Sequence, residues 1–186
     1  MGKQKQTASA KKSDDKPGFD IGPVVSAQHL ASGAMPSLSE IEFALNITTN
    51  AYQRWMVRAA SASGFGSLAA TDILVLHSIN HKGREKSLAD LCLVLNIEDT
   101  HLVNYSIKKL VGLGLVKTGR RGKEKTAAIS EQGRVACERY RDIREALLVE
   151  SVISLGLDEA EISHIAKILR ALSGQYEQAA RSAASI

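Results

Sequence analysis

The positions of the prolines constrain the fold of this 186-residue chain more than any other feature. All three prolines lie within the first 36 residues, so residues 37–186 lack the residue that most strongly breaks helices. Apolar residues in this later stretch repeat in steps of three and four, the period of an amphipathic helix. Residues 1–36 show no sustained periodicity and are rich in Lys, Gln, Ser, Ala and Asp, which is typical of a flexible arm. The sequence therefore predicts a mainly helical protein behind an N-terminal arm.

Length and composition bound the class of protein. With 44% hydrophobic and 24% charged residues, the chain can form one compact domain, with or without an extended arm. No apolar run approaches the roughly 20 residues needed to span a bilayer, and the Lys-rich start lacks the apolar stretch of a signal peptide. We therefore expect a cytoplasmic protein. The two cysteines, Cys92 and Cys137, cannot build a disulfide framework and form no Cys-x-x-Cys pair for structural zinc.

Capping residues and glycines divide the helical stretch into segments. Ser37 with Glu40 and Asp158 with Glu161 match capping boxes, and Ser87 is a further N-cap candidate. The Gly-flanked basic segment between two short apolar runs favours a hairpin. The sequence predicts helices over about residues 37–63, 69–80, 87–95, 99–113 and 131–154 and from residue 158 onwards, with strands at 115–118 and 126–129.

The third and fourth of these helices are joined by the tight turn Asn96-Ile97-Glu98, and the hairpin follows at once. This order of elements is that of a winged helix-turn-helix, in which the second helix of the pair enters the DNA major groove. On that helix Val103, Ile107 and Leu110 share a stripe and are expected to pack inward. The opposite stripe can contact bases or phosphates and contains His101, Asn104, Tyr105 and Lys108, with Thr100 at the helix N-terminus.

Positive charge is concentrated in the same region. The whole chain has a net charge of +4, but residues 100–125 alone carry seven Lys and Arg against a single Glu, a net charge of +6. A block of this kind suits a polyanion such as nucleic acid. The alternative is an ordinary solvated face, as on most amphipathic helices. The predicted contacts from the wing, mostly to the DNA backbone, are Lys117, Arg120, Arg121, Lys123 and Lys125.

From about Ala69 to Gly133 the sequence resembles the MarR family of bacterial winged-helix transcription regulators. The resemblance rests on Leu88–Leu91 before the turn, on Val103–Leu110 followed by Leu113–Val116, and on Ile129–Gly133, which is similar to the family's Leu-Thr-x-x-Gly. The stretches Tyr52–Arg58 and Asn96–His101 are similar to a less studied subgroup of predicted regulators in this family.

The wing departs from the family pattern. Arg121-Gly122-Lys123 stands where the family usually carries Asp-x-Arg, and no acid partner for a brace is visible there. This departure bears on the detailed geometry of the wing and not on its charge.

The resemblance implies a homodimeric, sequence-specific regulator of double-stranded DNA whose terminal helices intertwine and which a small aromatic or phenolic effector modulates. Residues 37–66 would form an N-terminal dimerisation helix, 67–130 the DNA-binding lobe and 131–186 the C-terminal dimerisation helices. The seven-residue repeat of apolar residues from Ile162 to Tyr176 independently favours helix partners. The alternative is that these faces complete an intramolecular bundle.

Candidate sensing residues are fewer and less specific. Tyr52, Trp55 and Met56, with His77, are the candidates for an effector pocket, although residues at helical spacing are more often ordinary core. Cys92 and Cys137 are candidate redox switches, but no activating partner is visible beside either. The spacing of His77 and His81 can hold a metal, yet a third ligand is lacking, so we expect neither metal nor cofactor.

Two other classes of function were weighed against DNA binding. The chain has no phosphate-binding Gly-rich loop, His-Glu-x-x-His or Gly-x-Ser-x-Gly motif, so the sequence predicts that it is not an enzyme. A winged-helix module that binds protein or RNA without operator specificity is the remaining alternative. Salt dependence of duplex binding separates the two, because phosphate neutralisation predicts a linear fall of log affinity with log salt.

Overall fold

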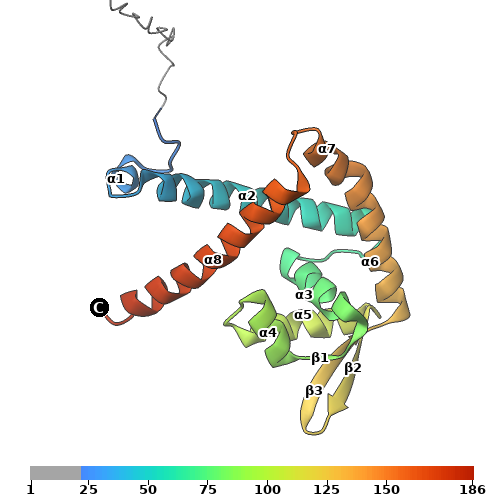
Figure 1. Ribbon diagram of the computed structural model, residues 1–186. Helices are drawn as coiled ribbons and strands as arrows, with labels where there is room; N and C mark the ends of the chain where they lie inside the picture. The colour runs from blue at the N-terminus through green and yellow to red at the C-terminus, as the bar shows by residue number, and fades with distance from the viewer. Residues whose placement is uncertain (1–21) are drawn as a thin grey trace, which may run out of the picture. The chain divides into compact units, whose positions relative to one another are not determined.

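The computed structural model describes residues 22–186 (Figure 1). Its contacts divide the chain into two units, one up to Ala51 and one from Tyr52 onwards, which are described separately. The larger part of the predicted N-terminal arm, residues 1–21, lies outside the described residues. None of the described helices is long and apolar enough to cross a membrane.

The first unit contains α1 (Gln28–Ala31) and the start of α2 (Pro36–Ala62). The prediction of an arm without structure up to residue 36 is therefore wrong for the single turn of α1. This turn is held because the Ser39 hydroxyl donates a hydrogen bond of 2.6 Å to the Leu30 carbonyl. The α2 helix begins one residue earlier than predicted, at Pro36, where the missing N–H has no helical partner to lose. Glu40, predicted to cap this helix, accepts a hydrogen bond from the Val24 N–H.

The helices of the second unit begin and end within a few residues of the predicted positions. Ser87 and Asp90 form a reciprocal capping box at the start of α4, and Asn96 ends α4 in the left-handed conformation. Asp158 and Glu161 form the predicted capping box of the last helix. The helices are α3 (Ala70–Asn80), η1 (His81–Gly83), α4 (Leu88–Leu95), α5 (Thr100–Gly112), α6 (Glu131–Arg144), η2 (Glu145–Val149), α7 (Glu150–Ile153) and α8 (Glu159–Ala183).

Three antiparallel strands form a small sheet in the order β1-β3-β2. The predicted hairpin corresponds to β2 (Val116–Arg121) and β3 (Glu124–Ile129), and β1 (Lys86–Ser87) adds a strand that was not predicted. Two residues are too short to show a strand period, which explains why β1 was missed. The strands are also longer than expected, because the turn comprises only Gly122 and Lys123, and Gly122 takes a positive φ of 64°. The predicted basic turn is therefore mostly strand.

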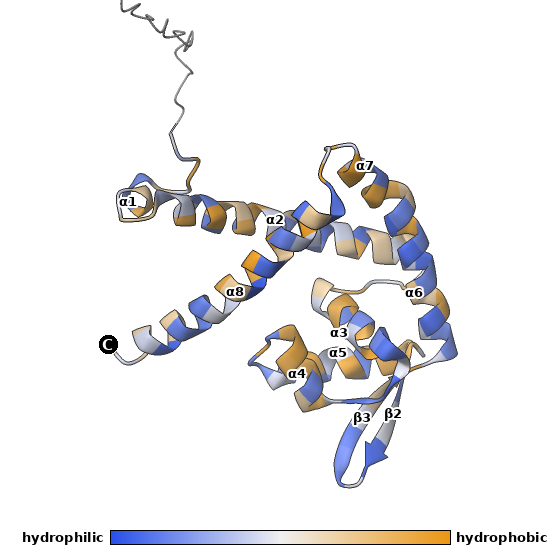
Figure 2. Cartoon of the chain, viewed as in Figure 1, coloured by the Kyte–Doolittle hydropathy of each residue, from blue (hydrophilic) through white to orange (hydrophobic). Residues whose placement is uncertain are grey.

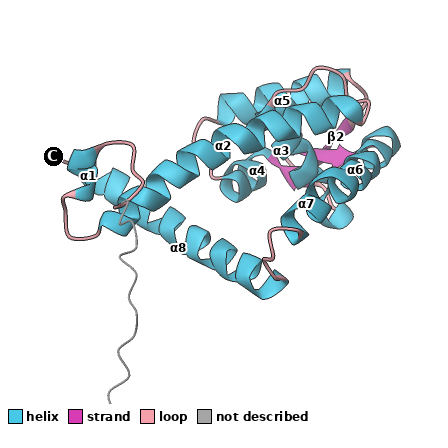
Figure 3. Cartoon of the chain, turned by 90° about the horizontal axis from the view of Figure 1, so that it is seen from above, coloured by secondary structure: helices cyan, strands magenta, loops and turns pink. Residues whose placement is uncertain are grey.

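The core lies where α3, α4 and α5 pack against one another and against the sheet (Figures 1 and 3). Ile73, Leu76 and Ile79 of α3 are fully buried, and Figure 2 shows the hydrophobic character of this helix. The predicted inward stripe of α5 is confirmed, since Val103 and Leu110 are fully buried and Ile107 is buried. This packing fixes α5 and leaves its other face outward.

The α6, η2 and α7 segments follow one another directly, so the predicted helix over residues 131–154 is confirmed with a wider turn inside it. Ala136 and Tyr140 of α6 are buried, whereas Leu147 is 63% exposed. No residue of α8 is buried, although the helix carries the predicted apolar repeat. On its apolar face Ile162, Ile165 and Ile168 are each more than 40% exposed.

Candidate nucleic-acid interface

The polar stripe of α5 faces solvent. His101, Tyr105 and Lys108 are exposed and Asn104 is half-buried, with Tyr105 at 67% relative exposure. Thr100, the first residue of α5, is also exposed. The Asp99 carboxylate caps the helix by accepting a hydrogen bond of 2.9 Å from the His101 N–H. One of the first amides of α5 is thus already occupied, and the acidic cap opposes a phosphate at that end.

A groove of about 590 Å³ runs between α5 and the hairpin. On the side of α5 it is lined by Asn104, Ile107, Lys108 and Val111. The strands contribute Arg120 and Lys125, which pair directly across the hairpin. The lining includes four cations, Lys86, Lys108, Arg120 and Lys125, and no Asp or Glu. Helix and wing therefore share one basic surface, as the sequence predicted.

Lys86 is a cation of this groove that the sequence analysis missed. Its side chain runs under the surface, with a residue exposure of 6%, and its Nζ donates a hydrogen bond of 2.6 Å to the His81 carbonyl. Burial lowers the pKa of Lys86, and the charges of Arg84 and Lys82 lower it further. The sequence signal that could have identified Lys86 is its position directly before the N-cap Ser87, because a residue at that position lies beside the start of α4.

Arg121 differs from the other cations of the hairpin. Its guanidinium lies 3.2 Å from the Glu124 carboxylate and 3.9 Å from that of Asp90. The statement that the wing lacks an acid partner is therefore wrong. Glu124 stands three residues after Arg121 in the same hairpin and was overlooked, whereas Asp90 comes from the first turn of α4, which the sequence of the wing does not reveal. Hydrogen bonds from Ser87 lower the pKa of Asp90, and the charge of Arg121 adds to this, so Asp90 stays ionised beside the wing.

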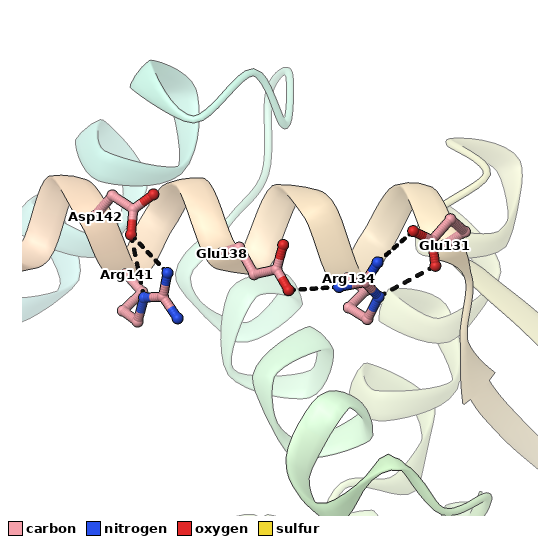
Figure 4. Close-up of polar contacts among 5 residues, drawn as sticks. All are labelled: Glu131, Arg134, Glu138, Arg141 and Asp142. Carbon is pink, nitrogen blue, oxygen red and sulfur yellow. Dashed lines mark hydrogen bonds and ion pairs between the residues drawn. The ribbon is translucent and has the colours of Figure 1, made fainter.

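Pairing of charges distinguishes this surface from α6. Figure 4 shows Arg134 between Glu131 and Glu138, and Arg141 beside Asp142. The Arg134 guanidinium lowers the pKa of Glu131. The cations predicted to contact DNA, apart from Arg121, form no ion pair within the part of the chain that the structure describes. These are Lys108, Lys117, Arg120, Lys123 and Lys125. Their charge is free to meet phosphates.

A second cavity, of about 350 Å³, lies between α3 and α6. The rings of His77 and Tyr140 meet edge to face there, with centroids 4.6 Å apart. His77 Nε2 is buried without a hydrogen-bond partner among the described residues, and burial lowers the pKa of His77. The lining residues are His77, Asn80, Cys137, Glu138, Tyr140, Arg141 and Arg144.

The structure does not gather the four predicted effector residues around this cavity. Only His77 lines it; Met56 is core at 1% exposure, and Tyr52 is 50% exposed. Trp55 packs against the core, and the cavity is lined instead by Tyr140, a residue that was not predicted for this site.

The cysteines and histidines show no assembled reactive centre. Cys92 and Cys137 are both free, and burial raises the pKa of the Cys137 thiol to about 11. At neutral pH Cys137 is therefore a thiol and not the more reactive thiolate. Among the described residues, no three His, Cys, Asp or Glu side chains lie close enough to hold a metal ion.

Comparisons with known proteins agree with this geometry. The model of the winged helix DNA-binding domain family matches residues 68–133. A MarR family transcriptional regulator from Rhodococcus sp. RHA1 has a TM-score of 0.59 at 16% identity, over 72% of this chain and 91% of that one. A MarR family regulator from Neisseria meningitidis has a TM-score of 0.59 at 15% identity, over 77% and 95%.

BpsR from Bordetella bronchiseptica, whose DNA binding is regulated by 6-hydroxynicotinic acid, has a TM-score of 0.52 at 24% identity, over 69% of this chain and 91% of that one. No curated protein matches the chain in sequence. The predicted fold class, a mainly helical winged helix-turn-helix, is confirmed. Residues 68–133 form a winged helix DNA-binding domain, and over about three quarters of its length the chain has the fold of the MarR family transcriptional regulators.

Proposed function

We propose that this chain is a homodimeric transcription regulator that binds double-stranded DNA in a sequence-specific way. The observation that carries the proposal is the groove between α5 and the hairpin, which four cations and no acid line. A surface of this kind attracts the phosphate backbone, and the exposed stripe of α5 beside it is free to read base edges in the major groove. A winged helix domain is also the unit that the family model matches.

The side chains divide between two kinds of contact. Asn104 is half-buried at the groove, which limits its freedom and suits a bidentate contact to adenine. His101 and Tyr105 extend the same stripe, and Thr100 lies at its start. The backbone contacts fall to the unpaired cations Lys108, Lys117, Arg120, Lys123 and Lys125. Arg121 contributes less to DNA binding, because Asp90 and Glu124 already neutralise it.

A homodimer accounts for the uncovered apolar face of α8. Ile162 and Ile165 are 41% and 46% exposed, and Ile168 and Leu169 are 41% and 37% exposed. A second copy that packs on this face would bury the part of these side chains that is still exposed, each contributing about 1 kcal/mol. A twofold axis then places two α5 helices in successive major grooves, with half-sites about 10 base pairs apart.

The cavity beside His77 is the proposed effector site. The unpartnered His77 Nε2 offers a hydrogen bond inside it, while Arg141 and Arg144 at its rim are paired with Asp142 and Glu145. A small aromatic molecule with a hydrogen-bonding group fits this chemistry, and the structurally similar BpsR responds to a heteroaromatic acid. Such a ligand regulates DNA binding only if its affinity differs between the conformation of the protein that can bind DNA and the conformation that cannot.

A salt titration tests the proposal. We expect the wild-type protein to bind duplex DNA with log affinity that falls linearly with log salt, and with a slope of about −0.9 per phosphate neutralised. Arg120→Met should make this slope shallower by about one unit. Arg134→Met is the matched control, because this arginine is already paired on α6, and it should leave the slope unchanged.

Equal loss from both variants, or binding without salt dependence, would contradict the proposed interface. Preference for an RNA duplex over a DNA duplex of the same sequence would favour the alternative of an RNA-binding module, since the deep, narrow major groove of A-form RNA does not admit a recognition helix.

A further inference from the structure

Two adjacent lysines of α5 lie in different environments. Lys108 is exposed and lines the basic groove beside the hairpin. Lys109, one residue later, turns toward α3, and its Nζ lies 2.7 Å from an Asp72 carboxylate oxygen. The Lys109 side chain is 30% exposed, whereas that of Asp72 is 3% exposed. Neighbouring residues on a helix point about 100° apart, which explains how the two ammonium groups are separated.

Asp72 holds α5 by two bonds and caps its own helix by a third. One carboxylate oxygen accepts a hydrogen bond of 2.7 Å from the Ser106 hydroxyl. The other accepts from Lys109 Nζ at 2.7 Å and from the Ala69 N–H at 2.9 Å. A buried carboxylate with a cation and two further donors is fully satisfied. Burial alone would raise the pKa of Asp72, but these hydrogen bonds outweigh it and lower the pKa overall.

The bonds to Asp72 restrict the rotation of α5 about its own axis, which apolar packing alone restricts less well. Val103 and Leu110 hold α5 against the core, but side chains that make only apolar contacts allow some rotation of the helix about its axis. With a radius of about 5–6 Å to the side-chain tips, a rotation of roughly 20° moves a base-reading atom by about 2 Å. That displacement exceeds the range of about 0.5 Å within which a hydrogen bond keeps good geometry. Ser106 and Lys109 oppose it, because their bonds to Asp72 would break first.

We propose that Asp72 is a positioning residue for sequence reading: it fixes the rotation of α5 through Ser106 and Lys109 and keeps Lys109 away from DNA. The inference rests on the proposed function, because it concerns how the DNA-reading helix is held. On this account α5 presents one lysine of the pair to a phosphate, Lys108, and uses the other to hold the helix against α3.

The test compares two variants on two duplexes, one that the wild-type protein enriches from a random pool and one scrambled. Lys108→Met should reduce the salt slope by about 0.9, because it removes one phosphate contact. The double variant Asp72→Asn/Lys109→Met removes the ion pair without leaving a buried charge, and circular dichroism checks that it folds. It should keep the wild-type salt slope but lower the ratio of matched to scrambled affinity about fivefold or more, since Asn104 and its neighbours lose their alignment.

Lys109→Arg, which keeps a cation beside Asp72, should restore most of the affinity ratio that the double variant loses. The assignment is overturned if the double variant loses as much salt slope as Lys108→Met, or if it keeps the affinity ratio of the wild type. A wild-type protein that enriches no sequence contradicts the proposed function itself, whereas enrichment together with an unchanged ratio in the double variant contradicts the Asp72 assignment alone.

Discussion

Replacement of Gly133 by alanine should destabilise the DNA-binding lobe. A Cβ at this position would lie 2.1 Å from the Leu115 carbonyl oxygen and 2.7 Å from Ile129 Cδ1. Because the first of these atoms belongs to the backbone, about 1 Å of movement between the start of α6 and the chain before β2 is required to restore van der Waals contact. The same Leu115 oxygen accepts a hydrogen bond of 3.0 Å from the Ser130 N–H, which this movement would stretch or break.

The magnitude follows from three contributions. Overpacking costs about 1–3 kcal/mol and a lost buried hydrogen bond costs about 1–3 kcal/mol, while alanine gains about 1 kcal/mol over glycine in a helix. We expect a net loss of about 3 kcal/mol, which for a chain of this size lowers the melting temperature by about 10 °C. Thermal and urea unfolding followed by circular dichroism measure it.

Gly112→Ala is the matched control. No atom lies within 4 Å of the position of its Cβ, and Gly112 belongs to α5, so this variant should be as stable as the wild type or slightly more stable. Equal stability of Gly133→Ala and wild type would refute the steric reasoning and with it the close contact between the start of α6 and Leu115.

Three further predictions concern charge, reactivity and DNA contact. Since the folded pKa of Asp72 is lowered, its contribution to stability is complete above the unfolded pKa of about 3.9 and is lost as pH falls through the folded pKa. Asp72→Asn should therefore flatten the loss of unfolding free energy as the pH falls from about 5 towards 2. If the free energy of unfolding of this variant falls with pH as steeply as that of the wild type, the ion pair is contradicted. With a pKa of about 11, Cys137 should react with iodoacetamide at pH 7.5 more slowly in the native protein than in urea, and equal rates measured by mass spectrometry would place it at the surface. Asn104→Ala should change sequence preference by about 1–3 kcal/mol at one base pair. Arg120→Met should weaken binding to all duplexes alike, and by more than Arg121→Met does. Gel-shift titrations on a panel of single-base variants of the duplex test both, and a larger loss of affinity for Arg121→Met would contradict the second.

The helices and the order of elements could be predicted because local signals encode them. Ser87 and Asp158 cap helices at the predicted places, and glycines end the elements between them. The exposed stripe of α5 followed from the helical period, since burial of Val103 and Leu110 on one side leaves the other side outward. These features depend on residues within one or two turns of each other.

Features that depend on distant residues were missed. The bond between Asp72 and Lys109 joins residues 37 positions apart, and Arg121 meets Asp90 from another element. The strand β1 exists only because Lys86 and Ser87 pair with β3, and no local pattern announces it. The pocket residues were chosen from the first two predicted helices, whereas the cavity that contains His77 is completed by α6. Such contacts arise when the elements pack, which periodicity and caps do not describe.

Amide hydrogen exchange with and without a cognate duplex tests the central claim most directly, because it reports which surface the DNA covers. The account predicts that added protection falls on residues 100–108 of α5 and residues 117–125 of the hairpin together, while residues 131–142 of α6, where Arg134 and Arg141 are already paired, are unchanged. Protection confined to α6, or to one of the two predicted elements without the other, would contradict it.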